Sequence, residues 1–285
     1  MNSVPFAFYD AVTRSFWRYL TPCCALAGLV GVVAEETHQK LFSNCLRIEN
    51  GRFFHHHFQY MFHREENASN HPNYELFTVL TFAGTDEVSL DAESSKALLA
   101  YRRKFAICLD FKTSTVSKET HEFIDLLRFV TVLQFHAESA KLIPEIMQKL
   151  VPKKTLSSIQ FDEYTFDVTT SNLLLDLLKQ EQFSVANLPK QSTELMKKII
   201  ADWRVNSEKF IGKMVYSGMH PGEPFYQNAL LKRNIRECTN DEQRALRCYN
   251  PYTALMYWKI STNRKGDAIY WHVTSEKPEV AFFFA

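Results

Sequence analysis

Three consecutive histidines, His55-His56-His57, are the residues of this chain whose type and spacing come closest to a metal site. On a strand, His55 and His57 would share one face and His56 would take the other, so this run could supply at most two ligands to one ion. The six cysteines form no C-x-x-C pair and show no zinc-ligand spacing. The sequence therefore predicts no metal and no cofactor, and we interpret the histidines as exposed residues of a hairpin.

Neighbouring carboxylates at Asp162-Glu163 and Asp241-Glu242 could supply ionisable groups to a reaction. Adjacent acids in loops are usually solvated, however, and no nucleophile stands at a recognisable spacing from a base. The H-E-x-x-H, P-loop, G-x-G-x-x-G and G-x-S-x-G motifs do not occur. The sequence predicts a protein that is not an enzyme. One alternative stays open: an α/β enzyme with its site at the carboxyl ends of parallel strands, which a deep pocket lined by ionisable groups would favour.

The elements that would position these residues follow an apolar-x-x-apolar-x-apolar step that recurs four times. Its first positions lie 29, 27 and 28 residues apart, and an amphipathic segment fills each gap. The steps are Leu127/Val130/Val132, Leu156/Ile159/Phe161, Phe183/Ala186/Leu188 and Ile211/Met214/Tyr216. Such a period indicates stacked strand-plus-helix units, hence an α/β fold with helices packed on a parallel sheet, either a curved solenoid or a doubly wound sheet.

Periodicity and turn residues place the individual elements. The predicted strands are 76–82, 105–111, 130–135, 159–164, 183–188 and 213–216, and the predicted helices are 94–104, 117–128, 140–151, 171–179 and 194–203. Asn50-Gly51 predicts a tight turn in a hairpin that starts at Cys45. Strand-like segments at 252–262, 267–274 and 280–284 are interpreted as an antiparallel cap over the edge of the last repeat. The predicted domains are a helical segment 1–44, a hairpin and connector 45–100, and a repeat domain 101–285.

Composition favours a globular protein that binds neither nucleic acid nor membranes. The chain has 33 basic and 32 acidic residues, 46% apolar and 23% charged residues, so no global field would attract polyanions. Six cysteines without a framework indicate reduced thiols and a cytoplasmic or nuclear location. The alternative is a secreted or surface protein with a cleaved leader, suggested by Arg14 and Arg18 before the apolar run 22–34 and by the sequon at Asn67. That run is shorter than the ~20 residues of a membrane span.

The recurring step resembles the L-x-x-L-x-L core of leucine-rich repeats. Where that family carries an inward asparagine, this chain has Phe135, Tyr164, Gln191 and Met219. The resemblance implies a body of leucine-rich-repeat-like βα units that lacks the family's asparagine ladder.

The N-terminus resembles the opening of an F-box, in the segment that contains Val4, Pro5, Phe6, Phe8 and Val12. The whole chain also resembles nematode F-box-associated proteins, in the runs 2–6, 47–51, 199–213 and 266–270. This resemblance implies that the N-terminal helix binds a Skp-type adaptor through those five residues. The repeats would then recruit a substrate to a ubiquitin ligase, or the fold would be F-box-derived and no longer bind the adaptor.

A predicted partner-binding face follows from the alternation of side chains along each strand. It comprises Phe129, Thr131, Leu133, Ser158, Gln160, Asp162, Asn187, Lys213 and Ser217, with Val185 and Val215 beside them. If helices or a neighbouring segment cover this face, Phe129, Leu133 and Val185 belong to the core instead. We therefore expect a non-catalytic protein-interaction scaffold whose partners are proteins.

Overall fold

The computed structural model of the chain describes residues 31–33, 41–49, 52–59, 74–84, 106–189, 192–217, 236–237, 239, 254–262, 268–274 and 280–284. A single sheet of 12 strands runs through these residues in the order β2-β1-β3-β4-β5-β6-β7-β8-β12-β11-β10-β9. The strands are β1 (Leu41–Glu49), β2 (Arg52–Gln59), β3 (Tyr74–Ala83), β4 (Ile107–Lys112), β5 (Val130–Phe135), β6 (Ser158–Phe161), β7 (Val185–Leu188), β8 (Met214–Ser217), β9 (Arg236–Glu237), β10 (Ala254–Thr262), β11 (Ala268–Thr274) and β12 (Val280–Phe284).

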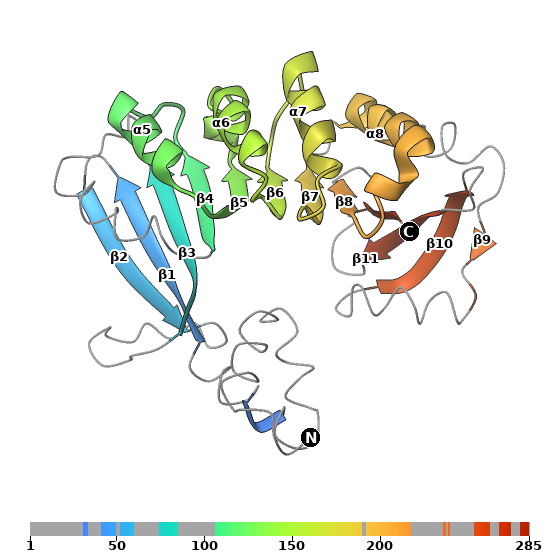
Figure 1. Cartoon of the computed structure of the whole chain (residues 1–285), viewed down its shortest axis with the longest axis horizontal. Coiled ribbons are helices and arrows are strands. Elements are labelled where there is room, and N and C mark those ends of the chain that lie inside the picture. Colours follow the sequence, from blue (N-terminus) through green and yellow to red (C-terminus); the bar gives the residue numbers. More distant parts are fainter. Residues whose placement is uncertain are drawn as a thin grey trace.

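Within the described part of the chain, seven strands of this sheet run parallel, namely β1 and β3 to β8. From β3 to β8 each new strand is added on the same side of the one before it. The crossover connection between two parallel strands is almost always right-handed. When successive strands are added in one direction, their connecting helices therefore lie on the same face of the sheet. Figure 1 shows α5, α6, α7 and α8 in a row along that face, from green to orange.

The four helices are α5 (Lys118–Leu126), α6 (Ile143–Leu150), α7 (Val168–Leu178) and α8 (Thr193–Asn206). Short 3-10 turns lie at Ala137–Ser139, Val151–Lys153 and Ser207–Lys209. Side chains cap two of the helices: Ser117 Oγ accepts from the amide of Thr120 at 3.3 Å, and Asp167 Oδ1 accepts from the amide of Thr170 at 2.6 Å. Pro144 lies in the first turn of α6, where its missing N–H costs no hydrogen bond.

The core lies between the helices and the face of the sheet that they cover. Four phenylalanines from adjacent strands stack in this core. The ring centroids are 5.1 Å apart between Phe82 and Phe111, 5.4 Å between Phe111 and Phe135, and 5.6 Å between Phe135 and Phe161. Each ring is at most 2% exposed, so the stack runs through the interior across β3 to β6.

Side chains at the entry to the strands tie neighbouring units together by hydrogen bonds to the main chain. Thr131 Oγ1 donates to the oxygen of Ile107 at 3.4 Å, Ser157 Oγ to that of Thr131 at 3.1 Å, and Ser184 Oγ to that of Ser157 at 2.9 Å. We call Thr131, Ser157 and Ser184 the hydroxyl ladder. The oxygens of Thr131 and Ser157 also accept main-chain amides, so the hydroxyls add a second link between neighbouring units, in a chain that lacks the asparagine ladder of leucine-rich repeats.

The α/β class and the individual elements from 105 to 217 were predicted correctly, with shifts of a few residues at their ends. The hairpin is also confirmed, since β1 and β2 pair antiparallel with Glu49 opposite Arg52. The predicted helix 94–104 lies outside the described residues.

The more specific prediction, a leucine-rich-repeat-like array between a helical F-box-like N-terminus and a C-terminal cap, is wrong. The sheet does not begin with the repeats at 101, because β1 and β3 belong to the same parallel run. The predicted helical segment 1–44 overlaps a strand, since β1 begins at Leu41; residues 31–33 are helical, and the others before Leu41 lie outside the described residues.

The C-terminal strands do not form a separate cap over the last unit. They pair antiparallel among themselves, but β12 pairs with β8 and so continues the same sheet edge to edge. Backbone bonds join the two at their ends: the amide of Gly212 donates to the oxygen of Phe284 at 2.8 Å, and the amide of Phe284 donates to the oxygen of Lys213 at 3.1 Å.

The register of the repeating step is also wrong in its first and last copies. Leu133 and Phe135, rather than Val130 and Val132, lie opposite Ile159 and Phe161. Thr131 is an extra residue between Val130, which pairs with Ile107, and Val132, which pairs with Cys108. This bulge reverses which side chains face the helices along the rest of β5.

The last copy is displaced by one residue. Val215, not Met214, lies opposite Ala186. Gly212, with φ of 77°, turns the chain into β8, and Ile211 before it is 57% exposed. Consequently Val132 and Tyr216 lie on the opposite face of the sheet from Phe161 and Leu188.

Candidate interaction surface

The face of the sheet opposite the helices carries a row of polar residues, one from each strand. Each stands between two inward residues of its strand, and the pairing places them side by side: Thr81, Asp110, Gln134, Gln160, Asn187 and Tyr216. Thr81 and Asp110 are 6% and 5% exposed, whereas the other four are partly exposed. The partly exposed members of this row therefore lie on β5 to β8. We call this side of the sheet, which α5 to α8 do not cover (Figure 1), the helix-free face.

Three carboxamides form the middle of this row. Gln134 on β5, Gln160 on β6 and Asn187 on β7 are direct neighbours in register. Gln160 Nε2 donates to Asp162 Oδ1 at 3.2 Å. Within the described part of the chain, the carboxamides of Gln134 and Asn187 have no hydrogen-bond partner. We call Gln134, Gln160 and Asn187 the carboxamide row.

A histidine held between two carboxylates lies at one end of the carboxamide row. His136 follows β5 directly, with Nε2 2.8 Å from Asp110 Oδ1 and Nδ1 2.7 Å from Asp162 Oδ2. The ring therefore lies between two carboxylates, with one short contact from each of its nitrogens. His136 thereby links the ends of β4, β5 and β6 on the helix-free face.

Asp110 is the most buried charge of this group. Its side chain is 7% exposed, and besides His136 it contacts Thr81 Oγ1 at 3.0 Å and Lys112 Nζ at 3.4 Å. A buried carboxylate is tolerated when donors surround it in this way.

A cavity of about 700 Å³ opens beside Asp162, at the carboxyl ends of the strands. It is lined by Ala137, Ala140, Asp162, Glu163, Tyr164, Thr165 and Pro189. Among the described residues of this lining, the two charged ones, Asp162 and Glu163, are both acidic. Burial raises the pKa of the Tyr164 phenol, whose hydroxyl lies 3.1 Å from Thr170 Oγ1. We call this space the acidic cavity.

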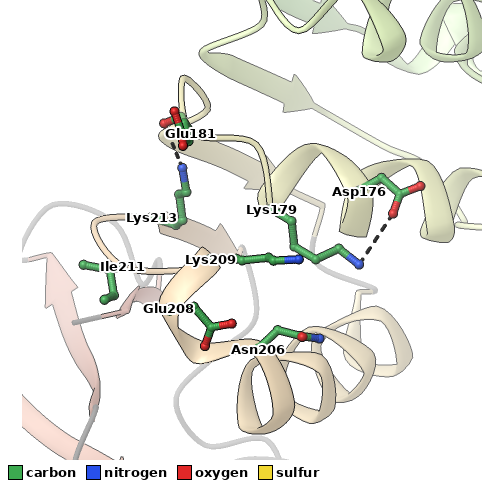
Figure 2. Close-up of a pocket in the computed structure, with 8 residues that line it drawn as sticks. All are labelled: Asp176, Lys179, Glu181, Asn206, Glu208, Lys209, Ile211 and Lys213. Carbon is green, nitrogen blue, oxygen red and sulfur yellow. Dashed lines mark hydrogen bonds and ion pairs between the residues drawn. The ribbon is translucent and has the colours of Figure 1, made fainter.

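A second cavity, of about 740 Å³, lies between α7, the end of α8 and the start of β8 (Figure 2). Its lining mixes cations and anions. Lys179 contacts Asp202 at 3.1 Å and Asp176 at 3.5 Å, and the latter pair is drawn in Figure 2. Lys213 also lines this cavity, and its ammonium is hydrogen-bonded within the fold.

Lys213 serves the fold rather than a ligand. Its Nζ donates to the oxygens of Gln180 at 2.7 Å and Glu181 at 3.1 Å, and also to that of Phe183. Burial lowers the pKa of this ammonium, and the charge of Glu181 acts in the opposite direction. Three carbonyls use its three N–H donors, so Lys213 caps the segment after α7.

Lys153 does the same for α5, since its Nζ donates to the oxygens of Ile124, Asp125 and Leu127 at 3.3, 2.9 and 3.0 Å. Burial lowers the pKa of Lys153 as well. Both lysines reach the helix end of a preceding unit, where a positive charge is favourable.

The structure divides the residues predicted for the partner-binding face. Ser158, Gln160, Val185 and Asn187 share the helix-free face, and Asp162 lies at its edge. Leu133, Val215 and Ser217 face the helices and are fully buried, and Lys213 is 4% exposed. Thr131 occupies the bulge, and Phe129, 37% exposed, precedes β5. The expectation of one common face is therefore wrong for Leu133, Lys213, Val215 and Ser217.

Ser217 has one further property. Its Oγ is buried opposite Leu188 and has no hydrogen-bond partner among the residues that the structure describes.

The predicted adaptor-binding residues Val4, Pro5, Phe6, Phe8 and Val12 lie outside the described residues. The same is true of the side chains of His55, His56 and His57, although their backbone belongs to β2.

Sequence reasoning missed Asp110, Gln134, His136 and Lys112. A signal for Asp110 and Gln134 was present, whereas His136 and Lys112 lie outside it. Most of these strands carry an apolar-polar-apolar triad near their carboxyl ends, as in Leu80-Thr81-Phe82, Leu109-Asp110-Phe111, Leu133-Gln134-Phe135, Ile159-Gln160-Phe161 and Ala186-Asn187-Leu188. The central residue of each triad forms the polar row.

Among the described residues, none of the helices combines the length and the apolar character needed to cross a bilayer. In the same residues no group of histidine, cysteine, aspartate and glutamate side chains is arranged to hold a metal ion.

We compared the chain with protein-family models, with curated proteins and with solved structures, and nothing in these three comparisons matches it. The resemblance to F-box-associated proteins therefore stays a prediction.

Proposed function

We propose that this protein is a non-catalytic interaction module that binds an extended segment of a partner protein across the helix-free face of β5 to β8. The observation that carries the proposal is the carboxamide row, in register on three adjacent strands and partly exposed. Two of its members, Gln134 and Asn187, have no hydrogen-bond partner in the described part of the chain.

The chemistry of the carboxamide row suits a polypeptide backbone. Each carboxamide offers both N–H donors and a carbonyl acceptor. Neighbouring strands lie about 4.8 Å apart, so the row presents alternating donors and acceptors along a line across the sheet. An extended segment lying along this line would pair its main-chain groups with Gln134, Gln160 and Asn187, much as a strand pairs with an edge.

The His136 network favours binding over catalysis. A general base needs a free lone pair within reach of the substrate proton. Both nitrogens of His136 already face carboxylate oxygens, at 2.8 and 2.7 Å. The network instead fixes the positions of Asp110 and Asp162 at the end of the carboxamide row. The proposal does not include an adaptor, because Val4 to Val12 lie outside the described residues.

Site-specific photo-cross-linking in the full chain tests this proposal. A photoreactive phenylalanine analogue would replace Ser158 or Val185, which lie beside the carboxamide row on the helix-free face, and Val168 or Val205 on the helices as matched controls. Val168 and Val205 are 69% and 75% exposed, so they are at least as accessible. We expect partner adducts from the two sheet positions in the protein's own cells and none from the helix positions. Adducts from Val168 or Val205 alone would show that the binding face is the helical one.

A further inference from the structure

Resting on the proposed function, the structure points to the chemistry of the bound segment. We propose that the segment carries an arginine or lysine whose cationic group enters the acidic cavity and pairs with Asp162 and Glu163. The cavity lies where a segment following the carboxamide row would reach it, because Gln160 is itself hydrogen-bonded to Asp162 at 3.2 Å.

The acidic cavity has the size and walls that a long basic side chain needs. Its volume is about 700 Å³, within the range of small-molecule sites. Ala137, Ala140 and Pro189 provide apolar surface for the methylene groups, and the Tyr164 ring provides an aromatic surface. Long cationic side chains bury their stems against such surfaces while the charged head meets the carboxylates.

The electrostatics of the cavity select a cation. Of the described residues that line it, Asp162 and Glu163 are charged and both are acidic. Within the described part of the chain Glu163 has no ion pair and no hydrogen bond, so none of the described residues neutralises its charge. An acidic partner side chain would be repelled here, whereas a basic one gains charge-assisted hydrogen bonds.

The Asp162 carboxylate is held in place for such a contact. His136 Nδ1 lies 2.7 Å from one oxygen, and Gln160 Nε2 donates to the other at 3.2 Å. An ionised carboxylate has about four lone-pair sites, so two remain for a ligand. The side chain is 38% exposed and thus accessible from the cavity. Preorganisation of this kind lowers the cost of ordering the site on binding.

A random-peptide library displayed on phage and selected against the full chain tests the inference. The dissociation constant of a selected peptide would be measured for the parent protein and for Glu163→Gln. A second measurement replaces the basic residue of the peptide by norleucine, which leaves the protein unchanged. Asp176→Asn is the matched control, because Asp176 is an acid on α7 with 66% side-chain exposure.

We expect selected peptides to share a basic residue, and the dissociation constant to rise about tenfold with Glu163→Gln or with norleucine, but not with Asp176→Asn. Peptides that lose binding with Asn187→Ala yet show no basic preference, or are indifferent to Glu163→Gln, would overturn the inference and leave the proposed function in place. If Asn187→Ala and Gln134→Ala leave the binding of every selected peptide unchanged, the proposed function itself is contradicted.

Discussion

Asp110 shows how a single buried charge can organise a surface. The side chain is 7% exposed, and it contacts Thr81, His136 and Lys112. Removing the negative charge would leave the His136 ring and the Lys112 ammonium facing a neutral group in place of the carboxylate that they contact. Removing one partner of such a contact lowers the free energy of unfolding by more than the contact itself contributes, because the buried partners that remain do not regain hydrogen bonds to water.

We therefore expect Asp110→Asn to lower the free energy of unfolding by about 2 kcal/mol. The control is Asp125→Asn. Asp125 forms an ion pair with Lys149 at 3.4 Å, and its side chain is 49% exposed, so this change removes a surface ion pair. That change should cost less than about 1 kcal/mol. Urea unfolding of the three proteins measures both values. Equal effects of the two substitutions would mean that the Asp110 network adds no stability beyond a surface pair.

At the residue scale the sequence predicted part of the helix-free face and no more. Ser158, Gln160, Val185 and Asn187 follow simple alternation in short regular strands, so period-2 reasoning placed them correctly. The bulge at Thr131 is a property of strand pairing and leaves no mark on hydropathy. His136 and Asp110 are 26 residues apart, and their contact depends on β4 and β5 lying in register.

At the scale of elements, the stacked phenylalanines and the hydroxyl ladder bind the strand-plus-helix units to one another. An interior ring in the stack has two ring neighbours, as Phe135 has at 5.4 and 5.6 Å. Phe82, at the end of the stack, has one such neighbour among the described residues, at 5.1 Å. Both side chains are buried to the same degree, so they differ mainly in the number of ring contacts.

Substitution by leucine keeps an apolar side chain and removes the ring contacts. We expect Phe135→Leu to lower the free energy of unfolding by about 1 kcal/mol more than Phe82→Leu, since each aromatic pair contributes about 0.5–1.5 kcal/mol beyond area burial. Thermal and urea unfolding of the two variants would measure this difference. A larger loss in Phe82→Leu would mean that packing at the stack's end, and not ring stacking, sets the stability.

Elements were easier to predict than their pairing. Buried apolar stripes such as that of α6, together with capping residues, fix where helices and strands occur, and these are local signals. The predicted last copy of the repeating step is displaced because it makes Ile211 its first buried residue. Ile211 is apolar but 57% exposed, and Gly212 after it turns the chain into β8. The hydroxyl ladder carries no hydropathy signal, because serine and threonine are common in every loop.

At the scale of the whole molecule, one sheet joins the parallel run to the antiparallel strands of the C-terminal part. Phe282 and Phe284 on β12 are fully buried. The Phe284 ring lies 6.3 Å from that of Trp203 on α8 and 5.5 Å from that of Phe210. The last strand of the chain thus completes the core beneath the last helix, although the sequence suggested a separate cap.

Because neighbouring units contact mainly one another, a defect at β12 should spread only a short way along the sheet. Phe284→Ala should cost about 3–5 kcal/mol locally. We expect faster amide hydrogen exchange in β8 and α8, with protection in β4 and α5 retained. Mass spectrometry of exchanged peptides resolves these segments. Uniformly faster exchange across all of them would show that the sheet opens as one cooperative unit.

The pairing of β12 with β8 has a consequence for how such a chain could lengthen by duplication of its units. The outer edge of β8 is already occupied by a strand that arrives from the far end of the polypeptide and runs the opposite way. A copy appended after β8 would have to displace that strand and strip Phe284 from its place beside Trp203. A copy inserted between β6 and β7 would separate one parallel pair, but it would give both strands a parallel neighbour again and would leave β12 paired with β8. Growth within the parallel run is therefore the route that disturbs this architecture least.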